Sequence, residues 1–247
     1  MSRIIVRPLS GNADQNRFIK LQWKFYDGDA NWVPPLLMDR KKLLNRKKNP
    51  FYDHAEMQLF MAERDGEAVG RIAAIVNHRH NEMHDDKVGF FGFFECINNQ
   101  DAADALFDAA AQWLRERGMD TMRGPLNPSI NDEIGMLVDG FDRPPVILMT
   151  YNPRYYPLLC DGYGFRKSKD LYAYLLENKK VVTDKLERGQ QLVRDRYNLT
   201  IRNVDFKNIE RDIVVLKDLY NRSWEKNWGA VAMTDREFDF LAADLVQ

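Results

Sequence analysis

Glu95 is the carboxylate whose neighbours in the sequence most clearly predict chemistry. It directly follows the phenylalanine-rich stretch 90–94. An apolar environment disfavours the charged form of a carboxyl group and therefore raises its pKa. A carboxylate with a raised pKa is suited to accept a proton near neutral pH, as a general base does. The alternative is a glutamate at a strand end that lies in solvent or pairs with Arg71.

Cys96, the next residue, is a candidate nucleophile because it adjoins Glu95. A catalytic cysteine needs a base beside its thiol, usually a histidine, and no histidine has a fixed spacing to Cys96. A free cysteine more often fills a small space in a hydrophobic core. The pattern therefore favours Cys96 as a core residue next to the candidate site.

The stretch 78–86 contains side chains of the types that bind metals. They are His78, His80, Glu82, His84, Asp85 and Asp86. His80 and His84 would share one face of a helix, whereas His78 and His80 would share one face of a strand. Because no single regular element presents all three histidines and no second cluster accompanies them, the pattern favours a solvated loop between strands. We predict no metal.

Hydrophobic periodicity predicts the framework that must position these residues. Apolar runs indicate strands at residues 4–6, 57–63, 68–76, 88–97, 120–123, 146–149 and 170–176. Helical spacing indicates helices at residues 12–25, 36–44, 101–118, 132–138 and 155–162. The turn around Asp65 and Gly66 joins two of the strands as an antiparallel hairpin.

The helix 101–118 is the most clearly periodic segment of the chain. A turn and helix cap at 98–101 precede it, and Gly118 ends it. It connects the strands 88–97 and 120–123, which predicts a strand-helix-strand crossover. Together with the hairpin, the crossover predicts an α/β (α+β) fold with a central mixed sheet and helices on both faces.

The chain is expected to change character after residue 178. Residues 1–178 form a first domain, and the charged, weakly periodic stretch 179–198 predicts a helical connector. Residues 199–247 resemble the beginning of the chain at a distance of roughly 195 residues. We interpret them as the start of a second repeat, apparently truncated because it ends inside a helix.

The composition predicts a folded protein in the cytoplasm. Hydrophobic residues make up 45% of the chain, enough for a sizeable core. Lys and Arg number 36 against 37 Asp and Glu, so no net charge attracts nucleic acid or an anionic membrane, although a local patch is compatible with this balance. We interpret the basic groups in 40–48 as a solvated helix face. Two separated cysteines indicate a reducing compartment, and no apolar run approaches the ~20 residues of a membrane span.

Several motifs between residues 4 and 176 resemble one known family. They are Asn31-Trp32-Val33-Pro34-Pro35, Asn49-Pro50-Phe51, His54-Ala55-Glu56, Val69-Gly70-Arg71-Ile72-Ala73-Ala74, Gly89-Phe90-Phe91-Gly92-Phe93-Phe94-Glu95, Gly124-Pro125, Asn131-Asp132-Glu133 and Tyr151-Asn152-Pro153-Arg154-Tyr155-Tyr156. With the order of the predicted elements, they resemble an uncharacterised bacterial family of the GNAT (Gcn5-related N-acetyltransferase) superfamily, with tandem domains.

The resemblance implies an acyl-coenzyme A co-substrate, acetyl-CoA or another acyl-CoA. In such enzymes it lies where the strand before the long helix separates from its parallel neighbour, with its pyrophosphate on amides at the helix N-terminus. The positions that match are Cys96, Ile97, Asn99, Gln100, Asp101, Ala102, Ala103, Asn152 and Tyr155. One departure is the absence of the family's glycines in 97–103, where Asp101 adds a negative charge and a possible helix cap.

The resemblance also implies the catalytic roles. Tyr156, with Tyr155 as second choice, is the general acid for the leaving thiolate. Glu95 or Glu133 is the base for an amine acceptor, a small molecule or a peptide, which attacks the acyl group directly. The alternatives are an inactive ligand-binding or scaffold module without coenzyme A affinity, and transfer from an aminoacyl or acyl-carrier donor.

Overall fold

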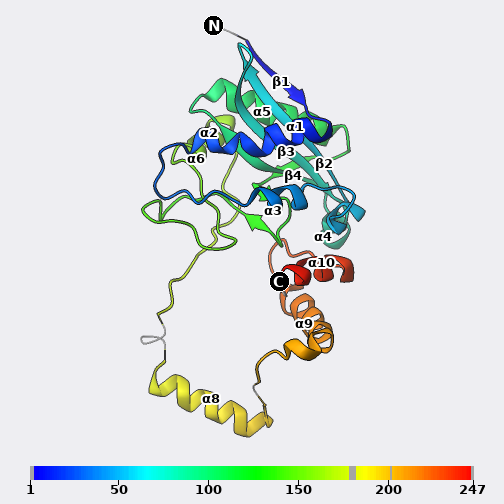
Figure 1. Cartoon of the computed structure of the whole chain (residues 1–247), viewed down its shortest axis with the longest axis vertical. Coiled ribbons are helices and arrows are strands. Elements are labelled where there is room, and N and C mark those ends of the chain that lie inside the picture. Colours follow the sequence, from blue (N-terminus) through cyan, green and yellow to red (C-terminus); the bar gives the residue numbers. More distant parts are fainter. Residues whose placement is uncertain (1–2, 178–181, 201, 246–247) are drawn as a thin grey trace.

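The computed structural model of the chain describes residues 3–177, 182–200 and 202–245 (Figure 1). Its strands are β1 (Ile4–Pro8), β2 (Ala55–Arg64), β3 (Glu67–Asn77), β4 (Val88–Cys96), β5 (Thr121–Arg123), β6 (Leu126–Asn127) and β7 (Glu133–Ile134). Its α-helices are α1 (Gly11–Lys20), α2 (Gln22–Phe25), α3 (Leu37–Leu43), α4 (His78–His84), α5 (Gln100–Arg115), α6 (Tyr156–Tyr163), α8 (Asp184–Tyr197), α9 (Ile209–Trp224) and α10 (Asp235–Leu245). Short 3-10 helices are η1 (Pro50–Asp53) and η2 (Phe206–Asn208).

The main sheet has the strand order β1-β2-β3-β4-β5. Neighbouring strands are antiparallel except β4 and β5, which pair in parallel. The β2–β3 hairpin turns at Asp65 and Gly66, whose φ angles of 53° and 82° suit a two-residue turn of type I′. Helix α5 makes the crossover from β4 to β5. The predicted hairpin and the predicted crossover are both confirmed.

Separate hydrophobic cores cover the two faces of this sheet. On one face, α6 and α5, the latter through Phe107, pack over Phe91 and Phe94 of the sheet. On the other face, α1, through Phe18, and the loops around it pack over Phe90. Strand β4 is buried along its whole length, which explains its nearly continuous apolar sequence. The predicted fold class, a mixed sheet with helices on both faces, is therefore confirmed.

Strand β4 contains a bulge at Phe93, whose φ is +50°. The register between β3 and β4 shifts between Arg71 and Ala73, so that β4 carries one more residue than β3 across this interval. The extra residue re-aims the side chains that follow it. Beyond the bulge, Glu95 lies directly opposite Arg71.

Gly92 lets β6, which pairs with β7, lie against β4 just beyond the residues at which β4 pairs with β5. A Cβ atom at this position would lie 1.6 Å from the carbonyl oxygen of Leu126, so no other residue fits without moving β6. The amide of Phe93 donates to Asn127 Oδ1 at 2.5 Å and fixes β6 there. Strand β6 pairs with β7, which brings Glu133 toward the same end of the sheet.

Two predicted strands and one predicted helix are wrong. Residues 146–149 form a turn, because Leu148 has a φ of +63° and the Met149 amide donates to the Val146 carbonyl. Residues 170–176 are apolar on both faces, a pattern that needs cover on both sides, and they form no strand in the described part of the chain. Residues 132–138 contain β7 and turns instead of a helix, because they pair with β6.

The prediction of a loop at 78–86 is also wrong, since most of it is helix α4 (Figure 1). Asn77 caps this helix by accepting the His80 amide at 3.1 Å, and Asp85 ends it in a left-handed conformation. An asparagine N-cap satisfies an amide that the first helical turn leaves without a partner. His80 is buried on the sheet side of α4 against Phe90.

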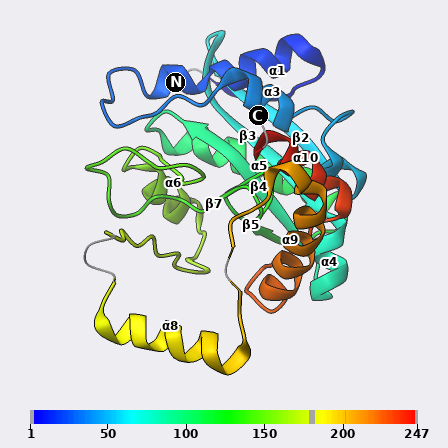
Figure 2. The same cartoon turned by 60° about the horizontal axis from the view of Figure 1, so that its bottom comes forward.

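The tail folds as helices in its described residues. Helix α8 occupies most of the predicted connector and lies apart from the other elements in both views (Figures 1 and 2). Residues 178–181 and Ile201 lie outside the described residues. The described part of the stretch predicted to repeat the first strand, 202–204, is not a strand. Thr234 caps α10, since its Oγ1 accepts a hydrogen bond from the Glu237 backbone amide. The division into domains stays a prediction.

Candidate functional site

Glu95 and Tyr156 form the centre of the candidate site. Tyr156 donates its hydroxyl proton to Glu95 Oε2 at 2.6 Å. Both side chains are almost completely buried. Glu95 comes from the end of β4 and Tyr156 from the first turn of α6, so the site joins the sheet to this helix. The structure thus brings together two of the residues that the sequence predicts as base and acid.

The Tyr156 oxygen has two fixed partners. Besides donating to Glu95, it accepts the backbone amide of Cys96 at 3.0 Å. Burial first, and then the charge of Glu95, raise the pKa of Tyr156 well above its ordinary value. The phenol therefore keeps its proton, and that proton faces Glu95.

Arg71 holds the other oxygen of Glu95. Its Nη2 lies 3.4 Å from Glu95 Oε1, and its Nη1 donates to the carbonyls of Phe18 and Ile19 at the end of α1. A cation is favourable beside the carbonyl end of a helix. The predicted alternative, in which Glu95 pairs with Arg71, is therefore part of the arrangement. Among the described residues, Arg71 Nε has no hydrogen-bond partner.

Burial raises the pKa of Glu95, and the charge of Arg71 with the hydrogen bond of Tyr156 opposes that rise. The pattern of apolar neighbours in the sequence predicts this direction. A buried carboxylate in this state is chemically a better base than one in water. We conclude that the geometry suits Glu95 to accept a proton from a group that enters beside it.

Tyr26 is a site residue that the sequence-based prediction missed. It lies at the C-terminal end of α2, with its ring stacked on Trp32 at 4.9 Å between centroids. Its hydroxyl donates to the Tyr151 carbonyl at 3.3 Å, and burial together with the charge of Glu95 raises its pKa. The signal in the sequence was the aromatic cluster that precedes the Asn31-Trp32 motif.

A pocket of about 580 Å³ opens over these residues. Its lining includes the polar groups Glu95, Arg71, Tyr26 and Tyr156. Other parts of its wall come from α3, from the loop 145–149 and from α10. The pocket is therefore assembled from segments far apart in the sequence, and its wall combines apolar side chains with many polar and charged ones.

Glu133, the other predicted base, lines the same pocket. Its carboxylate is paired with Arg40 of α3 and accepts a hydrogen bond from the side-chain amide of Asn127 at 3.3 Å. Both carboxylate oxygens of Glu133 therefore already have partners. Glu133 is therefore near the site, but its partners suit it to holding β6 and β7 against α3.

The remaining residues that the resemblance implies for acyl-CoA have structural partners. Tyr155 donates to the Cys96 carbonyl at 2.8 Å, and the Ile97 amide donates to the Val69 carbonyl. Asn152 binds both backbone groups of Leu137 through its side-chain amide. Burial, with the charge of Glu95, raises the pKa of the Cys96 thiol to about 12, which supports its interpretation as a core residue.

The N-terminus of α5 is capped by Asn99 rather than by Asp101. Asn99 Oδ1 accepts the Ala102 amide at 2.9 Å, and its carbonyl accepts the Ala103 amide at 3.2 Å. The Gln100 side chain donates to the Leu159 carbonyl and so ties α5 to α6. Two of the amides expected for a pyrophosphate are therefore engaged within the helix itself.

The histidines of α4 are dispersed among different partners. His78 pairs with Glu56, whereas the ring of His84 bonds the Ala230 carbonyl. Burial lowers the pKa of His80 to about 4. No group of three potential ligands that is arranged to hold a metal occurs in the described part of the chain.

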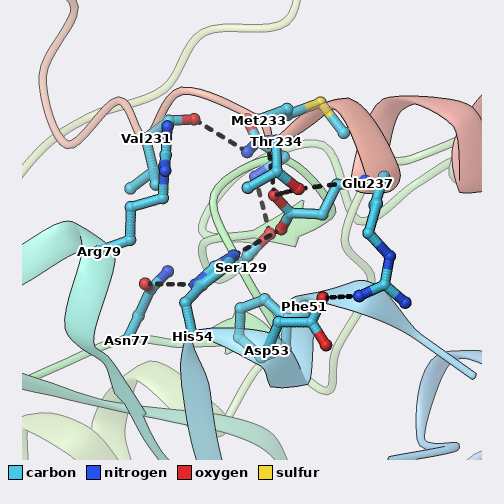
Figure 3. A network of polar contacts seen from close by, with 12 residues as sticks. Phe51, Asp53, His54, Asn77, Arg79, Ser129, Val231, Met233, Thr234 and Glu237 are labelled. Atoms are coloured by element: carbon cyan, nitrogen blue, oxygen red, sulfur yellow. Dashed lines mark hydrogen bonds and ion pairs between the residues drawn. The ribbon is translucent and has the colours of Figure 1, made fainter. Parts of the chain in front are cut away.

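The segment before α10 docks beside the pocket through a polar network around His54 (Figure 3). His54 Nδ1 lies 3.1 Å from Asn77 Oδ1, and Nε2 lies 2.9 Å from Glu237 Oε1. Asn77 Oδ1 also accepts the His80 amide, which fixes that atom as an oxygen. Because both ring nitrogens of His54 face acceptors, the ring is a cation in this arrangement.

The features expected from the sequence, a mixed sheet and a helical crossover between two parallel strands, are present, and the fourth strand carries a bulge. The fold is GNAT-like. No known protein-family model matches the chain. None of the described helices is both long and apolar enough to cross a lipid bilayer.

Two curated bacterial proteins are similar over almost the whole chain. The bacterial ceramide synthase of Caulobacter vibrioides is 35% identical over 247 residues, which is 98% of this chain and 63% of that protein. The protein YghO of Escherichia coli is 32% identical over 98% of this chain and 61% of its own length. The chain thus spans less than two thirds of the length of both relatives.

Solved acetyltransferase structures are similar at low sequence identity. An aminoglycoside acetyltransferase from an uncultured soil sample, in complex with sisomicin, is 14% identical with a TM-score of 0.43, covering 70% of this chain and 97% of that chain. An acetyltransferase from Clostridium acetobutylicum with acetyl-CoA is 11% identical with a TM-score of 0.41, covering 70% and 96%.

Proposed function

We propose that the chain carries the site of an N-acyltransferase that joins a fatty acyl group from a thioester to the amine of a lipid. The observation that carries this proposal is the Tyr156–Glu95 hydrogen bond in a pocket whose wall includes the apolar segments 33–36 and 146–149. The 35% identity to a protein named bacterial ceramide synthase supports a long-chain amine as acceptor, since ceramide is the amide of such an amine.

Glu95 is the base in this mechanism. The amine enters the pocket beside Glu95 and attacks the thioester carbonyl, which forms the C–N bond and a tetrahedral intermediate. Glu95 takes one proton from the attacking nitrogen. Since burial raises its pKa, this uptake is easier than for a carboxylate in water.

Tyr156 supplies the proton for the leaving group. Once Glu95 is protonated, it no longer attracts the Tyr156 hydroxyl, whose proton can then pass to the sulfur as the C–S bond breaks. The proton on Glu95 returns to the Tyr156 oxygen and restores the starting state. The Cys96 amide, 3.0 Å from that oxygen, stabilises the phenolate between the two transfers.

Arg71 and Tyr26 are positioning residues for this pair. Arg71 bonds the second oxygen of Glu95 and fixes its plane. Tyr26, stacked on Trp32, covers the pocket side of the same cluster. Side chains that hold a base in one orientation lower the cost of reaching the reactive geometry.

An acyl-carrier thioester is a second candidate donor, and the α5 N-terminus favours it. The Ala102 and Ala103 amides are bonded to Asn99, and no glycine allows a phosphate to approach them closely. A phosphopantetheine arm without the nucleotide does not need that cradle. The chemistry at Glu95 and Tyr156 is the same for both donors.

The test is amide formation from defined substrates. Purified protein is mixed with palmitoyl-CoA, acetyl-CoA or a palmitoyl-carrier protein, with sphinganine as the amine, and the product is followed by mass spectrometry. We expect N-palmitoylation that Glu95→Gln and Tyr156→Phe each reduce at least a hundredfold. Tyr163→Phe, on the same helix but hydrogen-bonded to Asp108 at the surface, is the matched control. Full activity in Glu95→Gln, or no product with any donor, would contradict the proposal.

A further inference from the structure

Two exposed apolar segments flank the mouth of the pocket. One is the turn 145–149, and the other is the segment 33–38 that leads into α3. Val146, Ile147 and Leu148 of the first and Val33 and Leu36 of the second line the pocket. We call these two segments together the apolar rim. More than 100 positions separate these two segments in the sequence, yet both line the same opening.

The turn 145–149 presents its side chains to the outside. The Met149 amide bonds the Val146 carbonyl, which places Ile147 and Leu148 at the tip of the turn. The side chain of Ile147 is 91% exposed. Turn tips are normally polar, and contiguous apolar patches on a protein surface mark contacts with another apolar phase. Four consecutive aliphatic residues at a tip therefore indicate a partner that is itself apolar.

The second segment adds positive charge next to its apolar residues. Met38 is exposed at the start of α3, and Lys41 follows it three positions later. Lys47 and Lys48 are exposed just beyond α3, and the stretch 40–48 contains no acidic residue. Aliphatic side chains bordered by lysines match a bilayer, whose acyl region takes the former and whose anionic headgroups attract the latter.

We propose that the apolar rim docks on the surface of an anionic lipid bilayer, with the pocket mouth toward the membrane. The aliphatic tip 146–148 enters the boundary between headgroups and acyl chains, and the lysines of 41–48 contact the headgroup phosphates. This inference rests on the proposed function in so far as it names where the lipid amine comes from. A substrate that is insoluble in water then enters the pocket directly from the bilayer.

The experiment measures binding to lipid vesicles without acyl donor or amine. Protein is floated with vesicles of phosphatidylcholine alone or with 30% phosphatidylglycerol, roughly the charge density of an anionic bacterial leaflet. We expect binding to the anionic vesicles that falls at least tenfold in Ile147→Asp/Leu148→Asp. Leu192→Asp on α8, an equally exposed aliphatic residue away from the pocket, is the control and retains full binding. Circular dichroism confirms that each variant is folded.

A second variant tests the contribution of the lysines to vesicle binding. Lys41→Glu/Lys47→Glu should remove the preference for phosphatidylglycerol and leave the weak binding to neutral vesicles. Equal flotation of the wild type and the Ile147/Leu148 variant, or no binding of the wild type to either vesicle, overturns the inference. A second copy of the chain on the rim would appear as a dimer in sedimentation that the same variant abolishes, with no vesicle binding. Because neither substrate is present, vesicle binding without amide formation would contradict only the proposed function.

Discussion

The Tyr156 hydroxyl lies between the Glu95 carboxylate, whose charge changes when it takes up a proton, and the Cys96 backbone amide, whose charge does not change. Glu95 Oε2 accepts its proton at 2.6 Å, and the Cys96 amide donates to its oxygen at 3.0 Å. The direction in which the phenolic proton points is thus governed by the protonation state of one carboxyl group. This relationship ties the strand end, the helix start and the proposed proton transfers together.

Tyr156→Phe should separate the catalytic role of the hydroxyl from its structural one. The variant keeps the ring but leaves the Cys96 amide and Glu95 without their partner, which should lower the free energy of unfolding by about 1–3 kcal/mol. Its kcat should fall at least a hundredfold, whereas KM for the amine changes little. Urea unfolding and steady-state kinetics measure the two effects. A raised KM for the amine with an unchanged kcat would contradict the role of Tyr156 as general acid.

Arg71→Met should be among the most destabilising substitutions in the sheet. Arg71 and Glu95 are both buried, and removal of one partner leaves an uncompensated charge, at a cost of about 3–5 kcal/mol. The double variant Arg71→Met/Glu95→Met should recover much of that loss, because no buried charge is left. Chemical unfolding of the single and double variants forms the test. Strictly additive effects of the two substitutions would show that the pair does not interact.

The docking of α10 should depend on pH through His54 and Glu237. Burial alone would lower the pKa of His54, but its hydrogen bond to Glu237 outweighs that and raises the pKa above the ordinary 6.5. His54 therefore stabilises the fold fully below pH 6.5 and loses this contribution as the pH rises through its higher folded value. Burial alone would raise the pKa of Glu237, but His54 lowers it below 4.5, so its contribution is lost only in more acidic solution.

These two shifts place the greatest contribution of the pair between pH 4.5 and 6.5. The difference in Tm between the wild type and Glu237→Gln should be largest in that window and should shrink toward alkaline pH. Hydrogen exchange of α10 amides should slow in the same window. Arg236→Gln, next to Glu237 but paired with Asp53 at the surface, is the control, and its difference from the wild type should not peak there. A pH-independent effect of Glu237→Gln would contradict this prediction.

Asn99→Gly should show whether the cap of α5 limits coenzyme A binding. Loss of an asparagine cap to glycine costs only a few tenths of a kcal/mol, so the helix should stay formed. The Ala102 amide is then released, and affinity for coenzyme A measured by calorimetry should rise severalfold. Asn98→Gly, which lies in the same turn but is not the cap, should leave the affinity unchanged. No gain in Asn99→Gly would indicate that the cap is not what limits binding and would leave the acyl-carrier donor favoured.

The centre of the site could be predicted from the sequence because its residues carry local signals. Glu95 stands after a run of phenylalanines, which predicts both the buried strand and the direction of its pKa shift. Tyr156 stands directly before Pro157, and proline is favoured in the first turn of a helix. Their contact could not be predicted from spacing, since 61 positions separate them and the bulge at Phe93 decides which way Glu95 points.

Residues whose positions depend on contacts with segments far away in the sequence could not be predicted. Tyr26 belongs to the site because α2 brings it over the end of β4, and the aromatic cluster around it does not show which strand it faces. The stretch 78–86 has no apolar stripe, yet Asn77 caps it into a helix and its one buried histidine faces Phe90. Residues 146–149 have the composition of a strand, but a tight turn places them at the mouth of the pocket. In each case tertiary context overrode a local propensity.

Helix α10 supplies part of the pocket wall through Glu237, Phe240 and Leu241, whereas the residues proposed to transfer protons come from β4 and α6. The residues proposed for the reaction and the residues that shape this part of the pocket therefore come from different strands and helices. Substitutions in the last turn-and-helix segment can reshape the cavity while the residues at Glu95 stay untouched. Under the proposed function, such a chain can change which substrates it accepts while Glu95 and Tyr156 stay the same, and a fragment that ends before residue 230 would keep both residues but lose this part of the pocket wall.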